Sequence, residues 1–159
     1  NQILHAAHLS AGHPQPLATQ LIEILPHAID IDGLMAYFEK IQVPAGEVII
    51  RQNAPSNEMY VIESGRLSAM LRMDDGEIVR MRTFGGGAVI GELGLYLNVP
   101  RTTSVIVDEP SMIYRLTGDA LARMESTAPI LAAAFHEYVA RLLAEKLVNT
   151  NNRVEALLE

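Results

Sequence analysis

A carboxylate and a guanidinium lie nine positions apart on a stretch of the chain that also carries two glycines. The stretch starts with Gly91-Glu92-Leu93-Gly94 and ends with Pro100-Arg101-Thr102-Thr103. Glycine lets a backbone approach a ligand closely and turn its N–H groups toward an anion. Arginine offers a planar fork of donors that matches phosphate oxygens, whereas an ionised glutamate only accepts hydrogen bonds and therefore suits hydroxyls. These residue types and this spacing predict a site for a sugar joined to a phosphate.

The longer run from Gly87 to Val105 resembles the phosphate-binding cassette of the cyclic nucleotide-binding domain family. Two other segments, Val43–Ile50 and Met59–Gly65, resemble the first strand pair of that family and its third strand with the following turn. Two positions depart from the family pattern. Gln52-Asn53 stands where the family usually carries Gly-Asp or Gly-Glu, and Ile90 stands where Phe is common.

The resemblance covers residues 41–150 and implies a role for each part of the motif. Arg101 would bind the cyclic phosphate, Glu92 would accept from the ribose 2′-hydroxyl, and backbone N–H groups would complete the cradle. The implied ligand is cyclic AMP or cyclic GMP, with no further cofactor, no metal and no catalytic residue, so that we expect a sensor and not an enzyme. The residues expected at the ligand are Gly91, Glu92, Leu93, Gly94, Arg101, Thr102, Thr103, Arg82, Phe84 and Thr150.

The choice of base depends on a few positions. Thr102 follows the phosphate-binding arginine, where relatives that favour cyclic GMP often have Thr. Arg82 lies on the strand that faces the base in the family, and a guanidinium can donate two bonds to guanine O6 and N7. However, Arg80 and Arg82 alternate with Val79 and Met81, which is also the pattern of a strand whose arginines face solvent. Cyclic AMP and cyclic GMP therefore remain equal alternatives.

A long helix is predicted after Pro129, because apolar residues recur there at helical spacing. In the resembled family this helix covers the nucleotide and often pairs with its copy in a second subunit, so a homodimer is expected. Lys146, Leu147 and Thr150 fall where the family's lid residues approach the base. Thr150 and Asn151 could donate to the purine or could only terminate the helix. The apolar stripe consists of Leu131, Phe135, Tyr138, Val139, Leu142, Leu143, Leu147, Val154, Leu157 and Leu158.

The middle of the chain reads as antiparallel β structure. Between Ile41 and Leu116, short runs of Val, Ile, Met and Tyr are separated by turn-forming groups that include Ser64-Gly65 and Asp108-Glu109-Pro110, a rhythm typical of a sandwich or barrel. Asp75-Gly76 predicts a hairpin in which 71–73 pairs with 78–80. The family implies a mainly β jelly roll, a double-stranded β-helix barrel, with N-terminal helices and a long C-terminal helix.

Three parts of the chain follow from these patterns. Residues 1–40 are expected to form a leader with short helices at 17–25 and 34–38, the second capped by Asp32. Residues 41–118 form the β-roll that binds the ligand. Residues 119–159 form the helices that cover the ligand and dimerise.

Composition excludes several classes of protein. The chain of 159 residues is 49% hydrophobic, enough for one core but not for two ordinary domains. Its formal net charge of −7 argues against a nucleic-acid partner, which requires clustered Lys and Arg. No apolar stretch is long enough to insert into a bilayer. The absence of cysteine fits a reducing compartment, so a cytoplasmic location is expected, including the cytoplasmic face of a membrane protein.

The sequence does not match the common enzyme motifs. The glycines of residues 85–91 do not have the spacing of a dinucleotide fingerprint, and His136-Glu137 is not followed by the second His of a zinc protease. The spacing of His5, His8 and His13 matches no compact metal site. Residues 141–147 and the Asn-rich continuation are similar to modules at the ends of bacterial sulfate permease-type transporters. The remaining alternative is a degenerate member of the family that serves as a dimerisation scaffold and binds no nucleotide.

Overall fold

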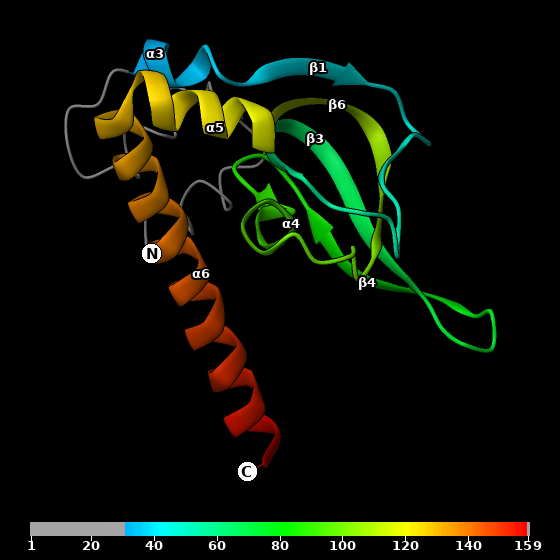
Figure 1. Cartoon of the computed structure of the whole chain (residues 1–159). Coiled ribbons are helices and arrows are strands. Elements are labelled where there is room, and N and C mark those ends of the chain that lie inside the picture. Colours follow the sequence, from blue (N-terminus) through cyan, green and yellow to red (C-terminus); the bar gives the residue numbers. More distant parts are fainter. Residues whose placement is uncertain (1–30, 159) are drawn as a thin grey trace.

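Six antiparallel strands form the sheet in the computed structural model, which describes residues 31–158. Four helices accompany the strands in this part of the chain, and Figure 1 shows α6 starting at the end of α5 that lies away from the strands and running past α4. The strands are β1 (Glu39–Val43), β2 (Val48–Ile50), β3 (Glu58–Arg72), β4 (Ile78–Phe84), β5 (Val89–Ile90) and β6 (Ser104–Thr117). The helices are α3 (Ile31–Met35), α4 (Glu92–Leu97), α5 (Gly118–Thr127) and α6 (Pro129–Leu158). This architecture confirms the mainly β fold with flanking helices that the sequence predicts.

Two long strands, β3 and β6, form the backbone of the roll. They pair with each other over nearly their whole length, from Glu58 opposite Thr117 to Met70 opposite Ser104. Their composition predicts that Ser64-Gly65 and Asp108-Glu109-Pro110 separate strands. In the structure these groups lie inside β3 and β6. The register shifts several times near Gly65, whose φ is +108°. Both strands therefore bend together at an irregularity, as bulges allow, instead of ending in turns.

The shorter strands extend the sheet on both sides. β1 and β2 pair with β6, whereas β4 and β5 pair with β3. The Asp75-Gly76 hairpin is confirmed, because Leu71 pairs with Val79 and Arg72 pairs with Ile78. Gly76 has a φ of +89°, the conformation for which glycine is favoured in tight hairpin turns.

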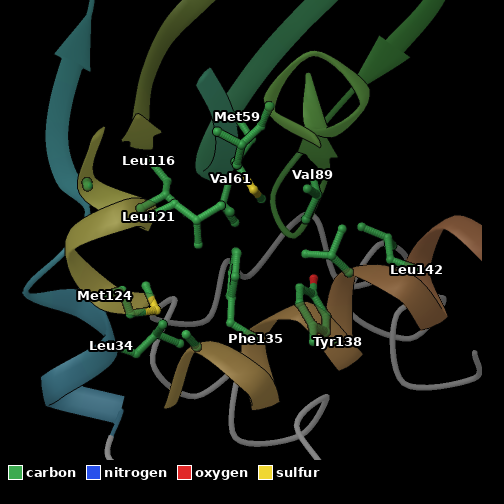
Figure 2. Packing of buried hydrophobic residues seen from close by; sticks show 14 residues of the cluster. Leu34, Met59, Val61, Val89, Leu116, Leu121, Met124, Phe135, Tyr138 and Leu142 are labelled. Carbon is green, nitrogen blue, oxygen red and sulfur yellow. The ribbon is translucent and has the colours of Figure 1, made fainter. Parts of the chain in front are cut away.

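The hydrophobic core has two parts. One lies inside the roll and includes Ile62, Leu67 and Val107. The other lies between the roll and the helices, where Met59 and Val61 of β3 pack with residues of α5 and α6 (Figure 2). Apolar burial of this kind is the main force that holds helices to a sheet. The second core therefore determines where α6 lies relative to the strands.

The observed helix bounds differ from expectation in α3. α3 spans Ile31–Met35 instead of residues 34–38, and Asp32 lies in its first turn instead of capping it. Thr117 caps α5, since its hydroxyl accepts from the N–H of Ala120 at 3.1 Å. α6 continues without a break to Leu158, so Thr150 and Asn151 do not terminate it. None of the helices in this part of the chain is long and apolar enough to cross a bilayer. The leader, the helix at 17–25 and the first three histidines lie outside the described residues.

Candidate functional site

A cavity of about 200 Å³ lies where α4 and the loop after it meet the roll and α6. Its wall combines polar groups of the Gly91–Thr103 segment with apolar side chains of several strands and one side chain of α6. The lining residues are Ile50, Arg82, Phe84, Val89, Ile90, Gly91, Glu92, Leu93, Gly94, Val99, Pro100, Arg101, Thr102, Thr103, Val105 and Lys146. A mostly apolar pocket with a few converging polar groups is the usual form of a small-molecule site.

Gly91 allows the chain to turn from β5 into α4 at the edge of this cavity. Its φ is +79°, in the left-handed region that glycine adopts without strain. A Cβ atom at this position would lie 2.6 Å from Nη1 of Arg101, and one on Gly94 would lie 2.8 Å from the same atom. The two glycines therefore leave the space that the guanidinium fills. The first N–H groups of α4 have no acceptor within the helix, which makes them available at the cavity wall.

Arg101 is held from both its backbone and its side chain. Its N–H donates to the carbonyl of Ala54 at 3.0 Å, and its carbonyl accepts from the N–H of Asn53 at 2.8 Å. The guanidinium donates to the carbonyl of Gly91 at 3.0 Å and to that of Glu58 at 2.6 Å. Partial burial lowers the pKa of Arg101 from its ordinary value, although nearby negative charges oppose the shift. The side chain remains a cation fixed at the cavity wall.

Tyr60 adds to this polar corner of the sheet. Its hydroxyl donates to Oε2 of Glu58 at 2.8 Å. Burial, followed by the hydrogen bond to Glu58 and the negative charge of that residue, raises the pKa of Tyr60 to about 12. The phenol therefore stays neutral at physiological pH. The carbonyl of Glu58, on the same strand, accepts from Arg101.

Glu92, the first residue of α4, is 5% exposed. Its Oε1 lies 2.5 Å from Nζ of Lys146, which comes from α6 and also donates to the carbonyl of Val89 at 3.1 Å. A buried carboxylate is costly unless it is paired and hydrogen-bonded, and Lys146 provides that pairing. The carboxylate therefore lies at the junction of the roll, α4 and α6.

A bulge in β4 separates two arginines that the sequence places on one face. Arg82 pairs with Ala69, whereas Arg80 pairs with the next residue, Met70. Because consecutive residues of a strand point to opposite faces, the extra residue Met81 puts Arg80 and Arg82 on opposite sides of the sheet. Only Arg82 of the two lines the cavity, with its guanidinium carbon 5.2 Å from the centre of the Phe84 ring.

Nearly all of the residues expected at the ligand line this one cavity. The exception is Thr150, which is exposed and donates its hydroxyl to the carbonyl of Lys146 at 2.9 Å. Lys146 lines the cavity instead, one helical turn earlier, and it contacts Glu92 and not the region of Arg82. Apolar wall residues such as Ile50 and Val105 could not be recognised from the sequence, because their position at the cavity depends on how β2 and β6 pair.

The combination of groups suits an anionic, hydroxyl-bearing ligand. A guanidinium and free N–H groups can hold phosphate oxygens, and a carboxylate can accept from hydroxyls. Within residues 31–158, no three His, Asp or Glu side chains gather as ligands for a metal ion.

Comparisons with known proteins agree with this chemistry. The chain is 34% identical over 85 residues to the cAMP-dependent protein kinase regulatory subunit of Blastocladiella emersonii, an alignment that takes in 54% of this chain and 21% of that protein. It is 31% identical over 113 residues to Glutaminase 2 of Bradyrhizobium diazoefficiens, covering 71% of this chain and 17% of the relative. The chain thus spans about a fifth of the length of these two relatives.

A solved structure and a family model complete the comparison. The crystal structure of a cyclic nucleotide-binding domain from Methylobacillus flagellatus has a TM-score of 0.73 and 17% identity, covering 96% of this chain and 83% of that one, which shows a shared fold. The model described as Cyclic nucleotide-binding domain matches residues 40–127. This match takes in more than half of the chain, and the chain therefore belongs to the cyclic nucleotide-binding domain family.

Proposed function

We propose that this chain is a sensor that binds cyclic AMP or cyclic GMP in the cavity bordered by Gly91–Thr103. The observation that carries the proposal is that Glu92 and Arg101 line one cavity together with the start of α4. Arg101 binds the cyclic phosphate, Glu92 accepts from the ribose 2′-hydroxyl, and backbone N–H groups at Gly91–Gly94 and Thr102–Thr103 complete the cradle. The Blastocladiella relative is named as the regulatory subunit of a cAMP-dependent protein kinase, which supports a ligand of this class.

The base lies, in this proposal, against Arg82, Phe84 and Thr102. Arg82 can donate to guanine O6 and N7. Its side chain is exposed, but it lines the cavity and its guanidinium lies beside the Phe84 ring, which supports a role at the cavity. Adenine offers N7 alone as an acceptor on this edge. Both nucleotides fit the groups present, and the two are to be measured side by side.

Binding is relayed through α6. In this proposal the β-roll of residues 41–118 holds the ligand, and the helices of residues 119–159 carry the change in state, so the chain regulates and does not catalyse. A ligand can shift such an equilibrium only through contacts that differ between the two states. The cytoplasm, including the cytoplasmic face of a membrane protein, is the proposed location.

Calorimetry with a ribose analogue tests the assigned role of Glu92. The chain is titrated with cyclic AMP, cyclic GMP and their 2′-deoxy forms. We expect micromolar binding of at least one ribonucleotide and a loss of about tenfold or more for its 2′-deoxy form, because a hydrogen bond to a charged group is removed. Glu92→Gln should weaken the ribonucleotide to a similar degree and should discriminate little between the two sugars.

Glu77→Gln is the matched control, since Glu77 is exposed and lies outside the cavity lining. This variant should bind both sugars as the wild type does. Failure of the wild type to bind either nucleotide at millimolar concentration would contradict the proposed function and would favour the scaffold alternative. Equal binding of ribo and deoxy forms would overturn only the role of Glu92.

We also propose that α6 pairs with its copy in a homodimer. Leu147, Val154 and Leu157 are 62%, 49% and 86% exposed, and with Leu143 and Thr150 they repeat at intervals of four and three residues. That spacing is the seam of a two-stranded coiled coil. Figure 1 shows the C-terminal part of α6 extending beyond the strands and α4.

Sedimentation of a seam variant tests the dimer. Leu147→Glu should weaken self-association by about tenfold or more, because it places a charge in an apolar contact. Val148→Glu is the control, since Val148 is 55% exposed but falls outside the seam. A wild-type chain that sediments as a monomer at all concentrations, or equal effects of the two variants, would refute this pairing.

A further inference from the structure

Lys146 reaches from α6 to both ends of the turn at Gly91. Its ammonium donates to Oε1 of Glu92 at 2.5 Å, on the first residue of α4, and to the carbonyl of Val89 at 3.1 Å, on β5. The Lys146 side chain is 34% exposed, and that of Glu92 is 7% exposed. A largely covered ion pair thus joins the long helix to the loop that borders the cavity.

Arg101, which lies on the same loop as Glu92, directs its guanidinium hydrogen bonds to backbone carbonyls and not to this carboxylate. The Arg101 guanidinium donates to the carbonyls of Gly91 and Glu58. Arg101 also attracts the Glu92 carboxylate through its charge, whereas Lys146 pairs with it directly. Removing one partner of a buried ion pair is strongly destabilising, because the other charge is left uncompensated. Beyond Lys146, Thr150 and the following residues of α6 are exposed, so this ion pair lies near the end of the part of α6 that is covered.

A ligand of the proposed class would act on both members of this pair. Its ribose hydroxyl would donate to the carboxylate that now accepts from Lys146. Its phosphate would bring negative charge into a cavity whose wall includes the ammonium of Lys146. Each change favours a Lys146 that leaves Glu92, and its departure removes a contact that joins α6 to the loop.

We propose that the Lys146–Glu92 ion pair is a latch, released when the ligand replaces Lys146 at Glu92, and that this replacement is how occupancy of the cavity acts on α6. The inference rests on the proposed function and names the contact, Lys146 with Glu92, through which binding would change the position of α6. Lys146 is a positioning residue in this scheme. It holds Glu92 and α6 in place without ligand and competes with the ribose for the carboxylate.

Removing the competitor should strengthen binding. Lys146→Met keeps the length of the side chain without its charge, and we expect it to bind cyclic AMP or cyclic GMP, whichever binds the wild type, about fivefold more tightly. Lys146→Arg retains a cation and should stay close to the wild type. In a Glu92→Gln background, Lys146→Met should give no further gain, because the two residues then no longer interact.

The control on the same helix is Arg153→Met, which removes one exposed positive charge outside the cavity. Its affinity should equal that of the wild type within a factor of two. Hydrogen exchange with and without nucleotide gives the second measurement. The ligand-dependent change over residues 139–150 should fall by at least half in Lys146→Met and should persist in Arg153→Met.

The outcomes separate the two proposals. If the wild type binds neither nucleotide, the proposed function fails and the latch fails with it. If the wild type binds but Lys146→Met binds equally or more weakly, with an unchanged exchange response, the latch alone is overturned. Thermal unfolding without ligand identifies a variant that has lost its fold. If Lys146→Met does not fold, Lys146→Gln takes its place as the variant without the charge, and an affinity equal to or weaker than that of the wild type then overturns the latch.

Discussion

Arg101→Ala is expected to weaken the binding of cyclic AMP and cyclic GMP by about 100-fold or more. A bidentate contact between a guanidinium and a phosphate combines two charge-assisted hydrogen bonds, each stronger than a neutral one. The side chain is also pre-positioned, because the carbonyls of Gly91 and Glu58 hold it at the cavity wall. The variant therefore loses both the charge and the alignment, and isothermal calorimetry measures the loss directly.

Two further variants show what part of the effect belongs to the phosphate. Arg101→Lys keeps the charge but lacks the planar fork, so its affinity should fall between those of the wild type and Arg101→Ala. Arg51→Ala removes an exposed arginine outside the cavity lining and should leave binding unchanged. An Arg101→Ala protein that is folded and binds as tightly as the wild type would remove this cavity from consideration as the nucleotide site.

Phe135→Ala is expected to destabilise the folded chain by about 3–5 kcal/mol, the range for deleting a fully buried aromatic side chain. Phe135 is 2% exposed and lies between the roll and the helices (Figure 2). Its ring meets Phe38 edge-on at 6.0 Å and lies 6.3 Å from the ring of Tyr138. The side chain thus helps to fasten α6, and with it Lys146, to the rest of the molecule.

Urea unfolding followed by circular dichroism measures this loss. Ile130→Ala is the matched control on the same helix, because Ile130 is 88% exposed and its replacement should change stability by less than about 0.5 kcal/mol. Similar small effects for both variants would mean that α6 is not packed on the core as described. The Phe135→Ala chain should also show a weaker exchange response of α6 to nucleotide, since the helix is less firmly placed.

The Gly91–Thr103 loop was the part of the candidate site that could best be predicted from the sequence. Glycine at a turn, a glutamate and an arginine nine residues apart, and Pro100 before the arginine all act over a short length of chain, where spacing limits geometry. The Asp75-Gly76 hairpin is similar, because the turn itself determines which residues pair. The long apolar stripe after Pro129 likewise predicts α6, whose helical hydrogen bonds are made within the segment.

Irregularities in the pairing of strands were not accessible in this way. Alternation along β4 predicts that Arg80 and Arg82 share a face, but a bulge opposite Ala69 and Met70 separates them. Ser64-Gly65 has the composition of a turn, yet the pairing of β3 with β6 continues through it. In both cases the hydrogen bonds to a partner strand, and not the local residue preference, determine the outcome.

The chain's own sequence thus predicted that the residues of the Gly91–Thr103 loop lie together at one cavity. It also predicted the hairpin and the helical stripe, since each of these depends on interactions among residues close together in the chain. Tertiary structure alone decided that Arg82 and not Arg80 reaches the cavity, that Lys146 and not Thr150 lines it, and that Glu92 is already paired. The helix repeat places Lys146 and Thr150 on the same side of α6, but only the packing of Phe135 and its neighbours fixes how far along the cavity that side extends. Because Glu92 is buried, its carboxylate needs a partner, and Lys146 is placed to supply the positive charge.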